Sequence, residues 1–311
     1  MDITWGASVN EIAWGGIIAF YLFLAGIAGG AFLTASLTEL FSKKQYPNVI
    51  RSGAYIAPVT IIIGLGLLVV DLGRPLTFWK LLLNVNFGSV MSIGVFIISA
   101  FSALAVVYAY LVWSAAAAKK QIKLASADEK LTALPEVVAT SESQGLQVLR
   151  KPVAILGALF SVGTATYTGF LLSAVTTSNF WHTPLLGIEA IPFLPILFLV
   201  SATSTGIAAT LIGAGNSRDL TSYKKIDMVL IILELVLISV LYLSVDPIFF
   251  TGSMALPFWF GVVAIGLVLP LLLSIYSIMK HKNVILPVSG LVIIGGLCLR
   301  YFVVYTGQLF R

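Results

Sequence analysis

The sequence predicts an all-α integral membrane protein whose eight membrane-spanning helices form two four-helix bundles. Of its 311 residues, 59% are hydrophobic and only 10% are charged, whereas a soluble domain carries about 25% charged residues. Eight apolar stretches each reach the roughly 17 to 25 residues that a helix needs to cross a bilayer. Their hydrophobicity is continuous, whereas the strands of an outer-membrane barrel alternate between apolar and polar residues, so the stretches are predicted to be helices.

The eight predicted helices follow one another along almost the whole chain. They cover residues 12–40, 49–70, 89–113, 152–176, 191–213, 226–245, 256–278 and 284–304. The first stretch is too long for a signal peptide, has no basic segment before it and contains no small-residue cleavage site, so we expect it to remain as a helix.

One long polar segment divides the chain. Residues 114–149 begin as an Ala/Lys-rich extension of the third helix and end rich in Ser, Glu and Gln, which is typical of a connector. Residues 1–113 then contribute three helices and residues 150–176 the fourth helix of the first bundle. Residues 177–311 form the second bundle.

The distribution of basic residues predicts the orientation, because lysine and arginine in short loops are retained on the cytoplasmic side. Of the 18 basic residues, 14 fall in or beside the loops after the first, third, fifth and seventh helices. These 14 are Lys43, Lys44, Arg51, Lys119, Lys120, Lys123, Lys130, Arg150, Lys151, Arg218, Lys224, Lys225, Lys280 and Lys282. We therefore expect a multi-pass protein of the cell membrane with both termini outside. The net charge of +5 reflects this bias and does not indicate a nucleic-acid partner.

The few potential metal ligands do not form a redox centre. A haem-bearing membrane helix bundle uses pairs of histidines, but the chain has two histidines, His182 and His281, on opposite predicted faces. We interpret both as surface residues. The single cysteine, Cys298, lies within the last helix and is interpreted as a packing residue. We expect no metal, haem or iron–sulfur cluster in this chain.

Polar side chains at membrane depth are the remaining functional candidates, because such groups are costly in lipid. By helical rise, Tyr167 and Arg300 lie roughly 22 and 24 Å from the inner ends of their helices, in the outer third of the membrane. Tyr21 lies near the same layer, and the rim contributes Asp71, Arg74, Ser89 and Ser92. Two interpretations remain open: an ion pair of Asp71 with Arg74 or Arg300 that ties helix ends, or a pocket for an amphipathic ligand such as a quinone.

Several motifs resemble the NrfD-like membrane subunits typified by polysulfide reductase. They are "YLFLAGIAGGAFL", "DLGRPLTFWKLL" followed by "SVMSIG", "YTGFLL", "LPILFLVSATSTGIA" and "GGLCLRYFVVYTGQ", and they occur in order along nearly the whole chain. "DLGRP" and the closing "LR" and "GQ" are the most specific of them. In this sequence Tyr21 stands where some relatives have a histidine, and Ile18 where they have a polar residue.

The resemblance implies a haem-free anchor that oxidises a quinol of the menaquinone type. Electrons would pass to a four-cluster iron–sulfur subunit and on to a molybdopterin catalytic subunit on the outer face, with sulfur or polysulfide as the expected acceptor. Catalytic roles at the quinol would fall to Tyr167, Arg300 and Asp71. Quinone contacts would come from Tyr21, Tyr167, Ser92 and Arg300, and partner docking from Arg74, Trp79 and Lys80. Terminal catalysis would belong to the partner subunit.

Two other classes of function remain open from the residues alone. Glu234 lies within the sixth predicted helix, where a carboxylate is characteristic of secondary transporters. The same residue could instead serve a proton path to the quinone site. A membrane anchor without a quinone site is the third possibility.

Overall fold

The computed structural model describes residues 15–42, 45–71, 79–80, 86, 88–125, 135–215, 220–280 and 284–309. Its helices are α1 (Gly16–Phe41), α2 (Pro47–Asp71), α4 (Val90–Ala125), α5 (Pro135–Ser173), α6 (Phe193–Ala214), α7 (Thr221–Ser244), α8 (Leu269–Lys280) and α9 (Ile285–Leu309). Between α7 and α8 lie the 3₁₀ turns η2 (Pro247–Phe250) and η3 (Gly252–Met254) and the π-helix η4 (Pro257–Val268). Within the described residues, eight helical segments are long and apolar enough to cross a membrane, which confirms the predicted fold class.

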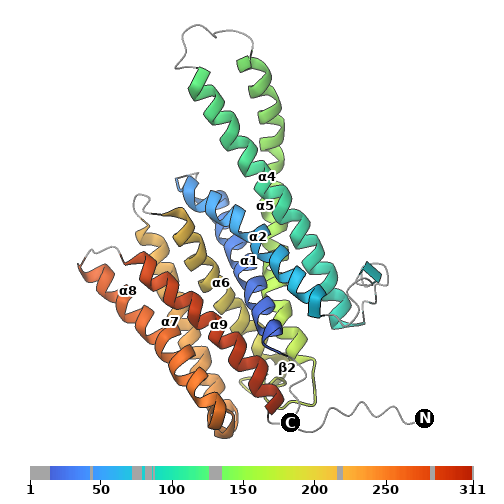
Figure 1. Ribbon diagram of the computed structural model, residues 1–311, viewed down its shortest axis with the longest axis vertical. Helices are drawn as coiled ribbons and strands as arrows, with labels where there is room; N and C mark the ends of the chain where they lie inside the picture. Colours follow the sequence, from blue (N-terminus) through green and yellow to red (C-terminus); the bar gives the residue numbers. More distant parts are fainter. Residues whose placement is uncertain are drawn as a thin grey trace.

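The segments run alternately up and down, so the molecule has two distinct ends. At one end α1 begins and α9 ends, and we call it the terminal end (Figure 1). At the other end lie the connections α1–α2, α4–α5, α6–α7 and α8–α9. We call it the basic end, because 14 of the 18 basic residues in the sequence belong to these connections and the helix ends beside them.

Two helices project far beyond the others at the basic end (Figure 1). α4 has 36 residues and α5 has 39, whereas about 20 residues suffice to span the hydrocarbon layer. Most of the 114–149 segment therefore belongs to the ends of these helices, and residues 126–134 lie outside the described part. The physical reason is composition, because the Ala, Lys and Gln residues that follow Trp113 are strong helix formers.

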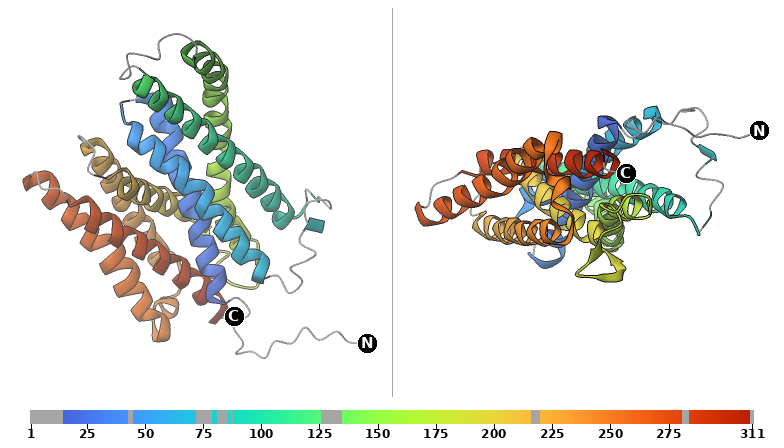
Figure 2. Two further views of the ribbon diagram at one scale, coloured as in Figure 1. Left: turned by 45° about the horizontal axis from the view of Figure 1, so that its top comes forward. Right: turned by 90° about the horizontal axis from the view of Figure 1, so that it is seen from below.

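α1 and α6 pack against each other where the first bundle, α1, α2, α4 and α5, meets the second, α6, α7, η4–α8 and α9 (Figure 2). Small residues allow their backbones to touch. A Cβ atom added at Gly30 would lie 1.9 Å from the carbonyl oxygen of Ala202, and one added at Gly206 would lie 2.1 Å from the backbone of Gly30. These are the "AGIAGG" and "SATSTG" runs, whose small residues indicate close helix packing.

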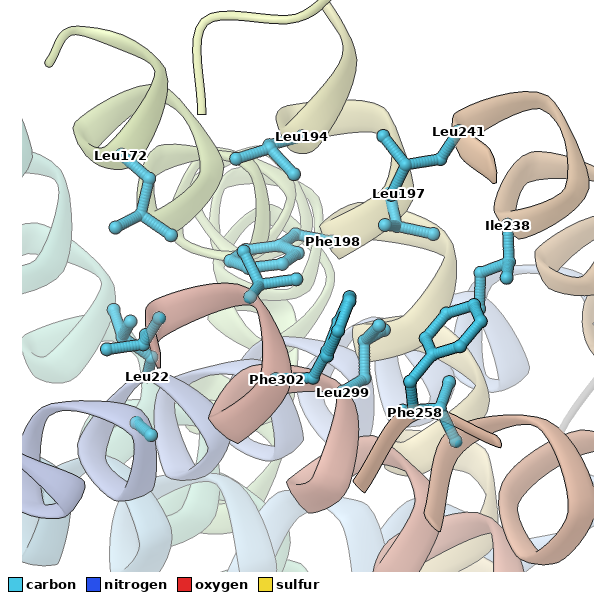
Figure 3. Close-up of a cluster of buried hydrophobic side chains, with 14 of the residues drawn as sticks. Leu22, Leu172, Leu194, Leu197, Phe198, Ile238, Leu241, Phe258, Leu299 and Phe302 are labelled. Carbon is cyan, nitrogen blue, oxygen red and sulfur yellow. The ribbon is translucent and has the colours of Figure 1, made fainter. Parts of the chain in front are cut away.

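An aromatic and leucine-rich core packs the second bundle against α1 and α5 (Figure 3). Phe258 from η4 and Phe302 from α9 have ring centroids 4.8 Å apart. Buried Trp181, in the α5–α6 connection, donates its indole N–H to the carbonyl of Val303 at 2.8 Å, which fixes that connection against α9. The same connection carries the two-stranded hairpin of β1 (Pro184–Leu185) and β2 (Ile188–Pro192).

Candidate functional site

Three of the residues predicted to lie in or beside the outer layer come together near the terminal end. Tyr21 on α1 interacts electrostatically with Tyr167 on α5 and with Asp71, the last residue of α2. Tyr21 and Tyr167 lie about 7.5 and 9 Å from the terminal ends of their helices. Tyr167 is buried, Tyr21 is half-buried and Asp71 is exposed. We call these three residues the tyrosine cluster. It places two phenol hydroxyls and one carboxylate along a short path from membrane depth to the surface.

Tyr167 has a defined position because α4 contributes a glycine opposite its ring. A Cβ atom added at Gly94 would lie 1.7 Å from Cζ of Tyr167. Any side chain at position 94 would therefore occupy the space of the ring. Sequence analysis did not single out Gly94, although it stands in the "SVMSIG" motif.

The other predicted residues of the first bundle line the terminal-end rim. Ser92, in the first turn of α4, accepts a hydrogen bond from the backbone N–H of Asn86 at 2.9 Å, and Ser89 precedes the same helix. Trp79 and Lys80 are exposed in the α2–α4 connection, with the Lys80 ammonium 5.8 Å from the Trp79 ring centroid. Arg74 lies outside the described residues.

The structure places Arg300 apart from the tyrosine cluster. Arg300, on α9, is only 2% exposed. Its Nη2 donates to the carbonyl of Phe198 at 3.2 Å, and its guanidinium lies 3.9 Å from the centroid of the Phe198 ring. Its electrostatic partner is Glu234 on α7. Among the described residues, no contact joins Arg300 to Asp71 or Tyr167.

A second buried carboxylate, Asp227, lies on the same helix as Glu234, and sequence analysis did not predict it as a site residue. Asp227 is 3% exposed, accepts a hydrogen bond from Ser204 on α6 at 2.9 Å, and interacts electrostatically with Glu234. Ser201, also on α6, lies beside the Glu234 carboxylate. A usable signal was present in the sequence, because residues seven apart lie on the same face of a helix.

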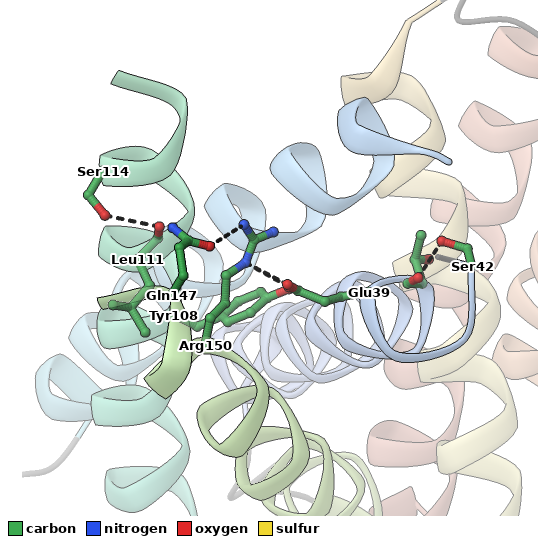
Figure 4. A network of polar contacts seen from close by, with 8 residues as sticks. Glu39, Ser42, Tyr108, Leu111, Ser114, Gln147 and Arg150 are labelled. Atoms are coloured by element: carbon green, nitrogen blue, oxygen red, sulfur yellow. Dashed lines mark hydrogen bonds and ion pairs between the residues drawn. The ribbon is translucent and has the colours of Figure 1, made fainter. Parts of the chain in front are cut away.

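A third polar group stabilises the basic end of the first bundle (Figure 4). Glu39 on α1 forms an ion pair with Arg150 on α5, with 2.7 Å between Oε1 and Nε. Tyr108 on α4 donates its hydroxyl to Oε2 of Glu39 at 2.5 Å. The network ties three helices together, and we assign it a structural role.

Of the two histidines, the structure describes one. His182 is exposed, with Nδ1 2.9 Å from the carbonyl oxygen of Ser173, and His281 lies outside the described residues. Among the residues that the structure describes, no three or more His, Cys, Asp or Glu side chains are grouped to hold a metal ion.

Comparison with known proteins gives a consistent family. The family model described as "Polysulphide reductase, NrfD" matches residues 6–311. A polysulfide reductase subunit of Wolinella succinogenes is 31% identical, over all of this chain and 99% of the relative. A protein NrfD homolog of Haemophilus influenzae is 32% identical, over 96% of this chain and 95% of the relative. A selenate reductase subunit of Mesobacillus selenatarsenatis is 27% identical, over 96% of this chain and 74% of the relative.

Proposed function

The chain belongs to the polysulphide reductase NrfD family, and from this premise we propose that it is the quinol-oxidising membrane subunit of a respiratory molybdopterin reductase. Two of its named relatives are subunits of polysulfide and selenate reductases. We assign sulfur or polysulfide as the acceptor reduced in the partner subunit. The basic end then faces the cytoplasm, by the distribution of lysine and arginine, and the partner subunits bind at the terminal end.

The observation that carries the proposal is the tyrosine cluster. Phenol hydroxyls can both donate and accept hydrogen bonds, and a carboxylate accepts protons, which suits the two hydroxyl groups of a quinol. Tyr21 and Tyr167 lie at membrane depth, where the apolar tail of a quinol stays in lipid. Asp71 lies at the exposed end of the cluster and connects it to water.

The arrangement supports a simple division of roles. A quinol that is oxidised to a quinone gives up two electrons and two protons. Tyr167 positions the head group through a hydrogen bond, with its ring held against Gly94. Asp71 accepts a released proton and passes it to water at the terminal end. The electrons leave toward an iron–sulfur subunit that docks over the α2–α4 connection, where Trp79 and Lys80 are exposed.

A Tyr167→Phe variant tests the site, because it removes one hydroxyl and keeps the ring. Loss of one hydrogen bond is worth about 1 to 3 kcal/mol, which corresponds to roughly a 5- to 150-fold loss of quinol-driven turnover if the bond forms in the transition state. Tyr110→Phe is the matched control, since Tyr110 is exposed on α4. Turnover and thermal stability are measured on the same sample of complex. Equal turnover in the two variants would mean that Tyr167 only packs.

A second experiment tests the partners directly. Mass spectrometry of the intact complex should identify an iron–sulfur subunit and a molybdopterin subunit, and solvent extraction should recover a quinone. An isolated chain without partners and without quinone would contradict the proposal.

A further inference from the structure

A small cavity opens among the helices of the second bundle at the basic end. Lys224, in the first turn of α7, lies on its wall together with Asp227. Three serines complete its polar lining: Ser274, Ser277 and Ser289. Its volume is about 20 Å³, which is enough for one water molecule. A hydrated ion or an organic solute needs more space, so the cavity suits water and protons.

From this cavity, buried polar groups continue toward the middle of the membrane. Asp227 is bonded to Ser204 at 2.9 Å, and Ser201 lies one turn farther along α6 beside Glu234. Glu234 then faces Arg300. We call the set Asp227, Ser204, Ser201, Glu234 and Arg300 the polar line. All five residues are no more than 5% exposed.

The polar line retains unused hydrogen-bonding capacity. The Ser201 hydroxyl lies within hydrogen-bonding reach of the Glu234 carboxylate. The Nε and Nη1 atoms of Arg300 are buried, and no hydrogen-bond partner for them lies among the described residues. Unpaired buried groups are costly and in folded proteins are usually satisfied by ordered water. Two such atoms on the arginine that interacts electrostatically with Glu234 indicate that water reaches this part of the polar line.

The charges of the polar line suit a group that gains and loses a proton. Asp227 and Glu234 interact electrostatically with each other, so two adjacent negative charges in hydrocarbon are unfavourable. Arg300 offsets the charge of Glu234, and half-buried Lys224 faces the same cavity as Asp227. A nearby cation therefore stabilises the charged form of each carboxyl group, and repulsion between the two carboxylates favours protonation of one of them.

We propose that the polar line is a proton inlet from the basic-end solution to Glu234 and Arg300 inside the second bundle. A proton enters through the cavity water, binds a carboxylate oxygen of Asp227, and moves by way of the Ser204 and Ser201 hydroxyls and water to Glu234. Arg300 Nη2 lies 3.4 Å from a Cβ added at Gly26 of α1, the helix that carries Tyr21. The inlet thus ends beside the helix of the quinol site. Resting on the proposed function, each proton taken up at the basic end is matched by one released at the terminal end, in addition to the two protons that the quinol gives up, and electron transfer from the quinol to the partner subunits drives this transfer.

Proteoliposomes test the inlet with the whole complex. With the basic end facing the lumen and a pH-sensitive dye enclosed, wild-type complex should make the lumen more alkaline as quinol is oxidised. Glu234→Gln and Asp227→Asn should each lower the rate of proton uptake by about 100-fold or more, the lower end of what a positioned acid–base group contributes. Asp246→Asn is the matched control, because Asp246 is an exposed carboxylate just beyond the end of α7.

The possible results distinguish failure of the proton inlet from failure of the proposed quinol site. Quinol oxidation without luminal proton uptake, or equal uptake in all three variants, would overturn the inlet and leave the proposed function standing. Where a carboxylate variant does not assemble, Ser201→Ala removes a hydroxyl of the polar line without changing charge. It should lower the uptake as well, and unchanged uptake in that variant would also overturn the inlet.

A readout that needs no turnover covers the case in which wild-type complex oxidises no quinol. The infrared C=O band of a protonated carboxyl group should be lost in Glu234→Gln or Asp227→Asn and should shift rapidly in D₂O if water reaches the polar line. Absence of such a band from the wild type, or slow exchange, would overturn the inlet on its own.

Discussion

Gly94 is the residue on which the position of Tyr167 depends most directly. In Gly94→Ala the new methyl group would coincide with the phenol ring, since the gap to Cζ is 1.7 Å. The ring must move or α4 and α5 must separate, and overpacking of this kind costs about 1 to 3 kcal/mol. We expect quinol turnover to fall at least as far as in Tyr167→Phe.

The control for this change is Gly66→Ala on α2, where a Cβ would meet nothing within 4 Å. Turnover and melting temperature should stay near the wild-type values in Gly66→Ala. A Gly94→Ala complex with normal turnover would show that the ring position does not matter for the reaction.

Glu39 carries the polar network of the first bundle, and its removal should act on stability rather than on the reaction. Glu39→Gln leaves the Arg150 guanidinium, whose side chain is 13% exposed, without its carboxylate. Breaking one partner of a buried ion pair typically costs about 3 to 5 kcal/mol. We expect a lower melting temperature with normal turnover at low temperature, and partial recovery in Glu39→Gln/Arg150→Met. A fall in turnover without a fall in stability would contradict the structural role.

The sequence predicts how deep a site residue lies in the membrane, but it does not predict which residue its side chain contacts. Helical rise gave a depth for Tyr167, and position in the chain put Tyr21 near the same layer and Asp71 at its rim; in the structure all three lie toward the terminal end. Helical rise also gave a depth for Arg300 but not the direction in which the side chain points, so the pairing of Arg300 with Glu234 could not be inferred. Asp227 is indicated only by its spacing, since it lies seven residues before Glu234 and so on the same face of α7.

The crossing of α1 and α6 sets how closely the two bundles approach. Gly206→Ala would bring a methyl group to 2.1 Å from the Gly30 backbone, which cannot rotate away as a side chain can. We expect a loss of about 1 to 3 kcal/mol of stability, measured as a lower melting temperature of the complex. Gly290→Ala on α9, where a Cβ would meet nothing within 4 Å, should keep or raise the melting temperature. Equal melting temperatures would mean that the crossing is looser than the structure shows.

Helices were predictable from hydrophobicity, but some helix ends and one helix type were not. The spans of α1, α2 and α6 agree with the apolar stretches to within a few residues. The ends of α4 and α5 differ because polar helix formers also occur in connectors. The π-helix η4 was not predictable from hydrophobicity, which is the same for both helix types. Its last bond runs from the N–H of Leu269 to Ala264, just before Pro270, which lacks an N–H and crowds the carbonyl four residues earlier.

The two bundles carry separate polar groups that meet at α1. The tyrosine cluster lies in the first bundle near the terminal end, and the polar line runs through the second bundle from the basic end. Arg300 lies against Gly26, and Tyr21 is about 7.5 Å farther along the same helix. α1 therefore links the proposed quinol site with the proposed proton path, and most of this helix is buried inside the molecule.

The orientation of the whole molecule in the membrane decides on which side each of these events occurs. Single cysteines at Lys280 and Leu186, in a Cys298→Ala background, mark the two ends, since Lys280 is exposed at the end of α8 and Leu186 is 72% exposed in the hairpin. Because basic loops are retained in the cytoplasm, an impermeant maleimide added to intact cells should label Leu186→Cys and not Lys280→Cys. Both should react after the cells are opened, which controls for reactivity. Labelling of Lys280→Cys in intact cells would reverse the orientation and place quinol oxidation on the cytoplasmic side.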